Sequence, residues 1–268
     1  MNKNVTRKLT ESAVMIATAT VLSMLKLIDL PYGGSVTLCS MLPVMLIGYR
    51  FGIGAGLLGG FAYSVIQLLL GLNTLAYATS AAAAVAIVFL DYIFAFTFIG
   101  LGGVFKKLFK NQSASMCLGM LLVCLIRYIF HTVSGCTVWA GLSIPTEKAL
   151  LYSLSYNATY MLPELLVSLL ITFYISAAVD FRGEKLIRKV KSENKADVFT
   201  TAGIFTAVVT LIADFVIAFS KLQNAESGEF DISGIANINV NAVLWVTVIG
   251  AVVTLILFFA GKAKKSNK

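Results

Sequence analysis

Five ionisable side chains lie inside long apolar stretches of this sequence, where burying a charge is costly. Such a group in the hydrocarbon region of a membrane usually faces a cavity or a helix contact, so each is a candidate for function. Arg127 and His131 are four residues apart and share one face of a helix. A lone carboxylate at Asp91 would be neutral unless it met a cation, either Arg127 or a cationic ligand. The five residues are Asp91, Arg127, His131, Glu164 and Asp214.

A second group of residues offers aromatic faces and an amide for ligand recognition. Tyr152, Tyr156 and Tyr160 begin an apolar segment, and Asn157 lies deeper in it, where its amide needs a partner in protein, ligand or water. Trp139 precedes them in the chain. Aromatic faces stack and attract cations, and an amide fixes orientation by hydrogen bonding. These residues, with Arg127 and His131, predict a pocket that opens to the outer side of the membrane.

Catalytic and metal chemistry have little support in the sequence. There is one histidine, and the cysteines lack the paired close spacing of a zinc or redox site. No G-x-x-x-x-G-K-[ST] loop is present, so any energy from ATP would come from another protein. We predict no catalytic residue, no metal site and no cofactor. The cysteines, read as helix-packing residues, are Cys39, Cys117, Cys124 and Cys136.

Two alternatives to a pure binding protein stay open at this point. A self-sufficient cation-coupled carrier could use Asp91 and Glu164 as proton sites. An intramembrane enzyme could use Asp91 and His131 as an acid–base pair, although it would need a nucleophile or metal that the sequence does not offer.

The composition is that of an integral membrane protein. Of the 268 residues, 58% are hydrophobic and 13% are charged, and the mean hydropathy is +0.87. A soluble domain does not have this composition, and a helix needs about 20 apolar residues to cross a hydrocarbon core. We predict an all-α membrane protein of eight transmembrane helices with both termini in the cytoplasm. The apolar blocks cover residues 9–27, 38–49, 53–70, 76–105, 115–133, 149–179, 200–220 and 242–260.

The blocks differ in length, which predicts departures from straight helices. The second block is short, and the fourth and sixth are long, so tilt, a kink or partial unwinding is expected there. Gly100, Gly102 and Gly103 in the fourth block, and Pro163 in the sixth, are the positions where we expect it.

The basic residues predict the orientation in the membrane, because Lys and Arg gather in cytoplasmic loops. All 21 lie on one side of the predicted topology except Lys26, Arg127, Lys148 and Lys221. The net charge of +8 is therefore explained by topology, and we predict no nucleic-acid partner. The charged run near residues 180–197 divides the chain. We expect a six-helix substrate-binding membrane domain at 1–180, a cytoplasmic linker at 181–199 and a two-helix membrane extension at 200–268.

The first two thirds of the chain resemble a known transporter family. The motifs are Leu9–Ala17, Tyr49–Gly52 followed by Ala55–Phe61, the pair Asp91-Tyr92, the glycines at 100–103, Arg127-x3-His131-x7-Trp139, and Tyr152-x4-Asn157. In order and spacing they resemble ThiT, the thiamine-specific substrate-binding (S) component of energy-coupling factor (ECF) transporters.

The resemblance implies a high-affinity thiamine receptor in the cell membrane of a prokaryote, which does not transport alone. Its expected partners are the lipid bilayer, a transmembrane coupling protein and two ATPases, with Ala13 and Ala17 on the docking face of the first helix. Asp91 takes the place of an acidic binding residue that is usually Glu. The expected ligand-binding residues are Asp91, Tyr92, Arg127, His131, Trp139, Tyr152 and Asn157.

The sequence departs from the family pattern in three places. The first outer loop offers Tyr32 where the family has a Trp, and the acid at Asp91 is one methylene shorter. These two differences leave a thiamine precursor, or another vitamin, as an alternative ligand. The last two helices have no counterpart in the usual six-helix member.

Overall fold

The structure is a computed structural model of the whole chain, and it describes residues 3–30, 33–138, 147–189, 198–222 and 232–266. The chain divides into two compact units, Met1–Arg188 and Lys189–Lys268. Each unit is described by itself. Trp139 and Tyr32 lie outside the described residues.

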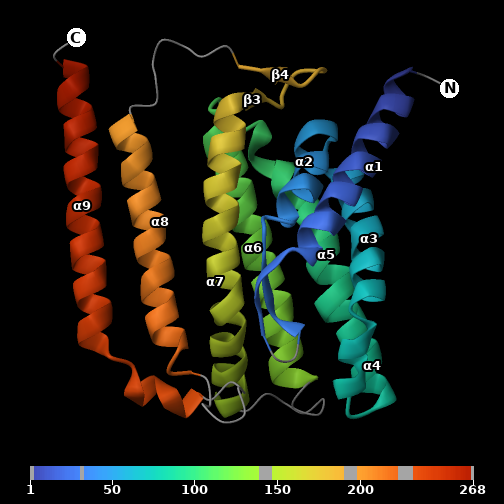
Figure 1. Cartoon of the computed structure of the whole chain (residues 1–268). Coiled ribbons are helices and arrows are strands. Elements are labelled where there is room, and N and C mark those ends of the chain that lie inside the picture. The colour runs from blue at the N-terminus through green and yellow to red at the C-terminus, as the bar shows by residue number, and fades with distance from the viewer. Residues whose placement is uncertain (1–2, 31–32, 139–146, 190–197, 223–231, 267–268) are drawn as a thin grey trace. The chain divides into compact units, whose positions relative to one another are not determined.

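The first unit is a helical bundle with two small two-stranded antiparallel pairs (Figure 1). Strand β1 pairs with β2, and β3 pairs with β4. The elements are α1 (Lys3–Met24), β1 (Lys26–Asp29), β2 (Ser35–Thr37), α2 (Met41–Phe51), α3 (Ile53–Leu70), η2 (Leu72–Tyr77), α4 (Ala81–Ile87), η3 (Val88–Phe94), α5 (Ala95–Thr97), η4 (Phe98–Lys106), α6 (Gln112–Thr137), α7 (Glu147–Ala178), β3 (Val179–Asp180) and β4 (Ile187–Arg188).

The helices follow the apolar blocks, with two corrections. The first helix ends at Met24, so its predicted end at residue 27 is wrong: Lys26–Asp29 pairs as a strand with Ser35–Thr37. The fourth begins at Ala81, where Ser80 caps it by accepting a hydrogen bond from the Ala83 amide, and not at residue 76. Both corrections concern ends, which depend on caps and pairing more than on hydropathy.

The chain is an all-α membrane protein, apart from the small strand pairs. Among the described residues, five helical segments are long and apolar enough to cross a membrane, and two shorter apolar helices accompany them. The five segments are Ile53–Leu70, Ala81–Lys106, Gln112–Thr137, Glu147–Ala178 and Val240–Leu257. The count of eight crossings stays a prediction.

The fourth helical segment is irregular, as its length suggested. It runs from α4 into a π-helical stretch, η3, and ends in the 3-10 helix η4, which contains the glycines at 100–103. A Cβ on Gly56 would lie 2.3 Å from the Gly100 carbonyl oxygen, so these glycines permit direct backbone contact between α3 and η4. A departure from a regular α-helix is thus confirmed at these glycines, as a tighter 3-10 helix and not as an unwound segment. Helix α7, by contrast, continues without a break through Pro163.

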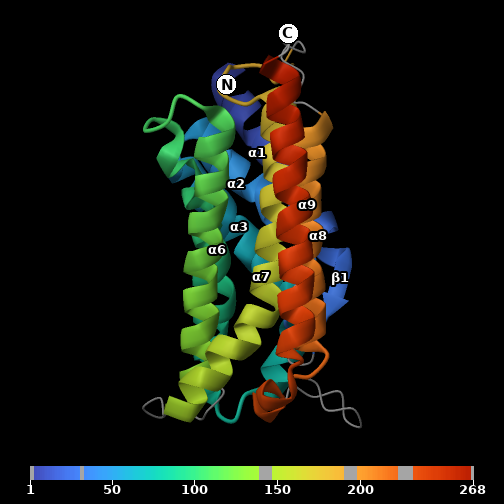
Figure 2. The same cartoon turned by 90° about the vertical axis from the view of Figure 1, so that its left-hand side faces the viewer.

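Helices α6 and α7 lie side by side and form one wall of the bundle (Figure 2). The Ser153 hydroxyl on α7 donates to the Thr132 carbonyl on α6 at 2.8 Å, and the Tyr128 hydroxyl donates to the Leu154 carbonyl at 2.9 Å. These bonds fix the end of α6 against the start of α7. The polar residues of both helices therefore meet at one end of the bundle.

The second unit consists of α8 (Val198–Phe219), the short helix η5 (Ile232–Asn237) and α9 (Val240–Ser266). The Thr247 hydroxyl on α9 donates to the Asp214 carboxylate on α8 at 2.6 Å. A Cβ on Gly250 would lie 2.0 Å from the Thr210 hydroxyl oxygen, so the two helices are in close contact there. The unit is thus a helical hairpin joined through small and polar side chains.

Candidate ligand-binding pocket

A cavity of about 650 Å³ opens at one end of the first unit. This volume lies within the ~300–1,000 Å³ typical of small-molecule sites. The cavity lies between the ends of α1, α3 and α6, the start of α7, the π-helix η3 and strand β2. The residues with polar or aromatic groups that line it include Ser23, Thr37, Gln67, Thr74, Asp91, Tyr92, Phe96, Arg127, His131, Tyr152, Tyr156, Asn157 and Tyr160.

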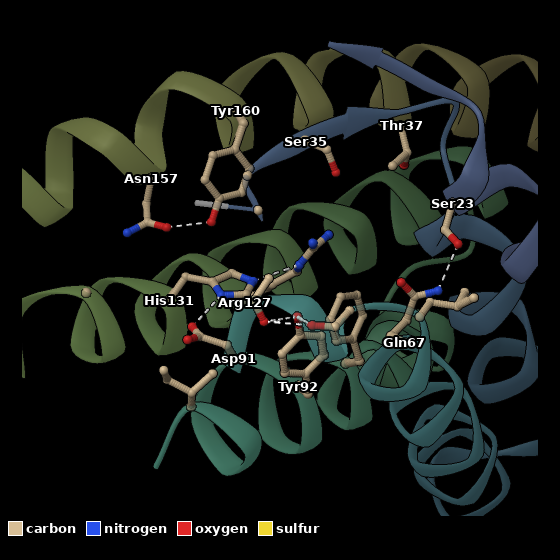
Figure 3. A pocket seen from close by; sticks show the side chains of 18 of the residues that line it. Ser23, Ser35, Thr37, Gln67, Asp91, Tyr92, Arg127, His131, Asn157 and Tyr160 are labelled. Atoms are coloured by element: carbon tan, nitrogen blue, oxygen red, sulfur yellow. Dashed lines mark hydrogen bonds and ion pairs between the residues drawn. The ribbon is translucent and has the colours of Figure 1, made fainter. Parts of the chain in front are cut away.

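Arg127, His131 and Asp91 form a hydrogen-bonded chain along one side of the cavity (Figure 3). Arg127 Nε lies 3.1 Å from His131 Nε2, and His131 Nδ1 lies 2.9 Å from Asp91 Oδ1. An arginine nitrogen can only donate, so His131 Nε2 accepts and carries no proton. His131 is therefore a neutral imidazole whose Nδ1–H donates to Asp91.

Ser134 completes the environment of the carboxylate. Its hydroxyl donates to Asp91 Oδ2 at 2.5 Å, so each carboxylate oxygen accepts one hydrogen bond from α6. Asp91 itself is in the π-helical stretch η3, and such irregular turns are common at functional sites. The Asp91 and His131 side chains are only 15% and 10% exposed, respectively. The carboxylate is thus held in one orientation at the cavity wall.

The Asp91 carboxylate has no direct contact with Lys26 or Arg127, the two cations among the described residues that line the cavity. Arg127 is 8% exposed, and its guanidinium lies 4.5 Å from the centre of the Phe96 ring. Lys26 is paired with Asp29, with its Nζ 3.0 Å from Asp29 Oδ1, while Arg127 reaches Asp91 only through His131. The Arg127–Asp91 ion pair that we considered is not formed, because His131 lies between them. Asp91 is therefore able to attract a cationic ligand.

Tyr92, next to Asp91, is held by two residues that follow α3. Its hydroxyl donates to the Gly71 carbonyl at 3.0 Å and lies 2.7 Å from the Thr74 hydroxyl. A Cβ on Gly71 would lie 2.2 Å from the Tyr92 hydroxyl oxygen, so no side chain fits at that position. The ring of Tyr92 also stacks near that of Phe96, with centroids 6.3 Å apart. This half of the pocket is thereby rigid and aromatic.

The other wall is a ladder of tyrosines on α7. Tyr152 and Tyr156 stack with centroids 6.4 Å apart and planes at 3°, and Tyr156 meets Tyr160 edge to face at 5.8 Å. Tyr160 also packs edge to face on His131, at 6.1 Å. The side-chain oxygen Oδ1 of Asn157 accepts from the Tyr160 hydroxyl at 2.5 Å, and the side-chain Nδ2 donates to the Ser153 backbone carbonyl at 2.9 Å. A flat ring between these walls would meet aromatic faces on both sides.

The structure brings together six of the seven residues that the sequence indicated as ligand-binding. Trp139, the seventh, lies outside the described residues. Ala13 and Ala17 are exposed on α1, and Glu164 is fully buried away from the cavity lining. No metal-binding group of His, Cys, Asp or Glu occurs among the described residues, and the cysteines are free. The six residues at the cavity are Asp91, Tyr92, Arg127, His131, Tyr152 and Asn157.

The sequence patterns did not indicate several residues that line the cavity or, like the buried Ser134, support its wall. Ser134 follows His131 by three residues, so helical spacing could have placed it on the same face. Phe96, Thr74 and Gln67 gave no such signal, because they belong to other segments and are ordinary in apolar helices. Gln67 donates to the Ser23 hydroxyl at 2.8 Å, which joins α3 to α1 at the far end of the cavity (Figure 3).

Comparison with known proteins decides the family. The model of the family described as "Thiamine transporter protein (Thia_YuaJ)" matches residues 9–181 of this chain. The chain belongs to this family. Over 171 residues it is 33% identical to the thiamine transporter ThiT of Bacillus subtilis (strain 168), covering 60% of this chain and 85% of that protein. A solved structure of ThiT from Listeria monocytogenes matches with a TM-score of 0.51 and 28% identity, covering 63% of this chain and 92% of the other.

The family match has two consequences. It covers the residues that line the cavity, so the pocket belongs to the part of the chain that the family shares. It ends at residue 181, before α8 and α9, so the helical hairpin of the second unit lies outside the matched region. The family is one of transporters.

Proposed function

We propose that this chain is the high-affinity thiamine receptor, the S component, of an ECF-type vitamin uptake transporter. The observation that carries the proposal is the Asp91 carboxylate, fixed by His131 and Ser134 at the wall of an aromatic cavity. Membership of the thiamine transporter family and the similarity to ThiT support thiamine as the ligand. The chain binds the vitamin without chemical turnover.

The chemistry of thiamine suits this cavity. Its thiazolium ring carries a permanent positive charge, which the Asp91 carboxylate and the faces of Tyr156 and Tyr160 would attract. Its aminopyrimidine ring offers donors and acceptors for Asn157 or the edge of the Asp91–His131 pair. The shorter acid at position 91 keeps a thiamine precursor as an alternative ligand. Titration with thiamine and with its pyrimidine precursor distinguishes the two ligands.

The first helix is proposed to dock the transmembrane coupling protein, which two ATPases drive. Helix α1 is attached to the bundle by the ion pair of Glu11 with Arg50, at 2.8 Å, and by hydrogen bonds such as that of Gln67 with Ser23. Ala13 and Ala17 lie on its exposed side, one turn apart. Two small exposed residues at this spacing let another helix approach closely.

The proposed setting is the cell membrane of a prokaryote, with both termini in the cytoplasm. The distribution of Lys and Arg supports this orientation, and it directs the open end of the cavity outward. Within the chain, we propose that residues 1–180 form the receptor, that 181–199 form a cytoplasmic linker and that 200–268 are an added two-helix membrane extension.

Titration of the purified protein with thiamine, followed by tryptophan fluorescence, tests the proposal. The chain has two tryptophans, Trp139 and Trp245, so Trp139→Phe separates a pocket signal from one in the second unit. We expect saturable quenching below micromolar ligand that is lost in Trp139→Phe. Absence of thiamine binding would refute the proposed ligand, and binding of the pyrimidine precursor in its place would establish the alternative.

A liposome experiment separates the receptor from a stand-alone carrier. The purified chain alone, reconstituted with a proton gradient, should take up no thiamine beyond what it binds. Uptake driven by the gradient would refute the receptor and support the carrier, and then Asp91→Asn and Glu164→Gln would identify the proton site.

A further inference from the structure

Glu164 is a buried acid for which the pocket has no direct use. Its side chain is 0% exposed in the middle of α7, and it does not line the cavity. Its Oε2 accepts from the Thr37 backbone N–H at 2.5 Å, and its Oε1 accepts from the Thr37 hydroxyl at 2.8 Å. Both oxygens thus bind one residue, 127 positions away in the chain.

Thr37 ends a segment that forms one wall of the cavity. Gly33, Gly34, Ser35 and Thr37 line the cavity, and we call residues 33–37 the wall segment. The Gly34 N–H donates to the Tyr156 hydroxyl at 3.3 Å, while Ser35–Thr37 pairs with Lys26–Asp29. The wall segment is therefore attached to α7 at two points, Tyr156 near the start of the helix and Glu164 further along it.

The backbone immediately after the wall segment is strained. Cys39 has φ 60°, the one positive φ of a non-glycine residue in the part of the chain that the structure describes. A side chain in this left-handed region raises the energy, so the conformation persists only where neighbours hold it. Thr37 lies two residues before Cys39 and bonds both Glu164 and the Ser40 hydroxyl, which lies 2.8 Å away. The bonds of Glu164 hold one side of this turn in place.

We propose that Glu164 is a positioning residue: it anchors the wall segment to α7 and so determines how firmly the cavity retains its ligand. This assigns Glu164 no contact with the ligand and no proton transfer. The effect on ligand retention rests on the proposed thiamine-binding function, whereas the effect on the wall segment does not.

Hydrogen–deuterium exchange on the full-length, ligand-free protein tests the anchor itself. Glu164→Met keeps about the same length but removes both acceptor oxygens, so the amide and the hydroxyl of Thr37 both lose their bonds to α7. We expect amide exchange in residues 33–38 to accelerate at least about tenfold, with exchange in α6 unchanged. The matched control is Thr172→Val, eight residues along α7, where the buried hydroxyl has no hydrogen-bond partner among the described residues; it should exchange like the wild type.

Stopped-flow binding of thiamine measures the consequence for retention. Glu164→Met should raise the dissociation rate at least about tenfold, leave the association rate within about twofold, and keep the full amplitude of quenching. Thr37→Val loses the hydroxyl bonds to Glu164 and Ser40 but keeps the amide bond to Glu164, so it should show a smaller change of the same kind. It decides the matter if Glu164→Met does not fold. The proposal is overturned if amide exchange in residues 33–38 of the Glu164 variant keeps the wild-type rate. It is also overturned if exchange accelerates equally throughout α6 and α7.

The two measurements separate failure of this inference from failure of the proposed function. If the wild-type protein does not bind thiamine, the proposed function fails, yet selectively accelerated exchange in residues 33–38 of Glu164→Met still establishes the anchor. If thiamine binds tightly and Glu164→Met changes neither exchange nor dissociation, the receptor stands and the anchor is wrong.

Discussion

Replacing Asp91 with Asn tests whether the pocket selects its ligand by charge. Asn keeps the size of the side chain, and its oxygen can still accept from His131 Nδ1–H, which lies 2.9 Å from Asp91 Oδ1. The Ser134 hydroxyl can rotate to accept from the new amide, because a hydroxyl both donates and accepts. The variant therefore removes the negative charge and leaves the local structure intact.

The magnitude follows from the charge and the low exposure of the site. At an effective dielectric constant of about 20, two unit charges about 5 Å apart interact by about 3 kcal/mol. Part of this is offset by the loss of water from both groups on binding. We expect Asp91→Asn to weaken thiamine binding by about 2–3 kcal/mol, roughly 30- to 150-fold in Kd.

A neutral ligand supplies the matched control. An analogue with a thiophene in place of the thiazolium has no positive charge for Asp91 to attract. Asp91→Asn should therefore change the affinity of the protein for this analogue by less than about threefold. Ser134→Ala removes one bond to the carboxylate and should weaken thiamine binding by about 1 kcal/mol, roughly fivefold. Calorimetric or fluorescence titration of all four combinations of ligand and Asp91 variant measures the coupling. An equal loss for the charged and the neutral ligand would refute electrostatic selection.

The remaining predictions concern stacking, docking and packing. Trp139→Ala should weaken thiamine binding by about 1–2 kcal/mol, and unchanged fluorescence or calorimetric affinity would remove Trp139 from the site. Ala13→Leu with Ala17→Leu should leave binding intact but block uptake by the reconstituted complex, and normal uptake would exclude that face of α1 from docking. Gly71→Ala should lower stability by about 1–3 kcal/mol, because the new methyl group would collide with the Tyr92 hydroxyl; a thermal unfolding midpoint equal to the wild type would contradict this.

Much of the architecture is visible in the sequence because a membrane helix is a local pattern. Apolar length predicts where α3, α6 and α7 run, and the glycines at 100–103 mark where the fourth segment tightens. The ends were less predictable. The first apolar block was predicted to run to residue 27, yet residues 26–29 form strand β1 because they pair with Ser35–Thr37.

The pocket was partly predictable for the same reason. Arg127 and His131 are one helical turn apart, and the tyrosines of α7 repeat every four residues, so each set had to share a face. Residues on different helices carry no such signal. Asp91 meets His131 and Ser134 across 40 and 43 residues of sequence, and only the packing of η3 against α6 determines that contact.

The sequence by itself determined a membrane protein of apolar helices, the family that its motifs resemble, and the side-chain types available to a cationic, aromatic ligand. The tertiary structure decided which of these side chains meet. It interposed His131 between Arg127 and Asp91, and it placed Glu164 against Thr37 and away from the cavity. The physical reason is that periodicity fixes which residues share a face of one helix, whereas the rotation and crossing of neighbouring helices fix which faces come together.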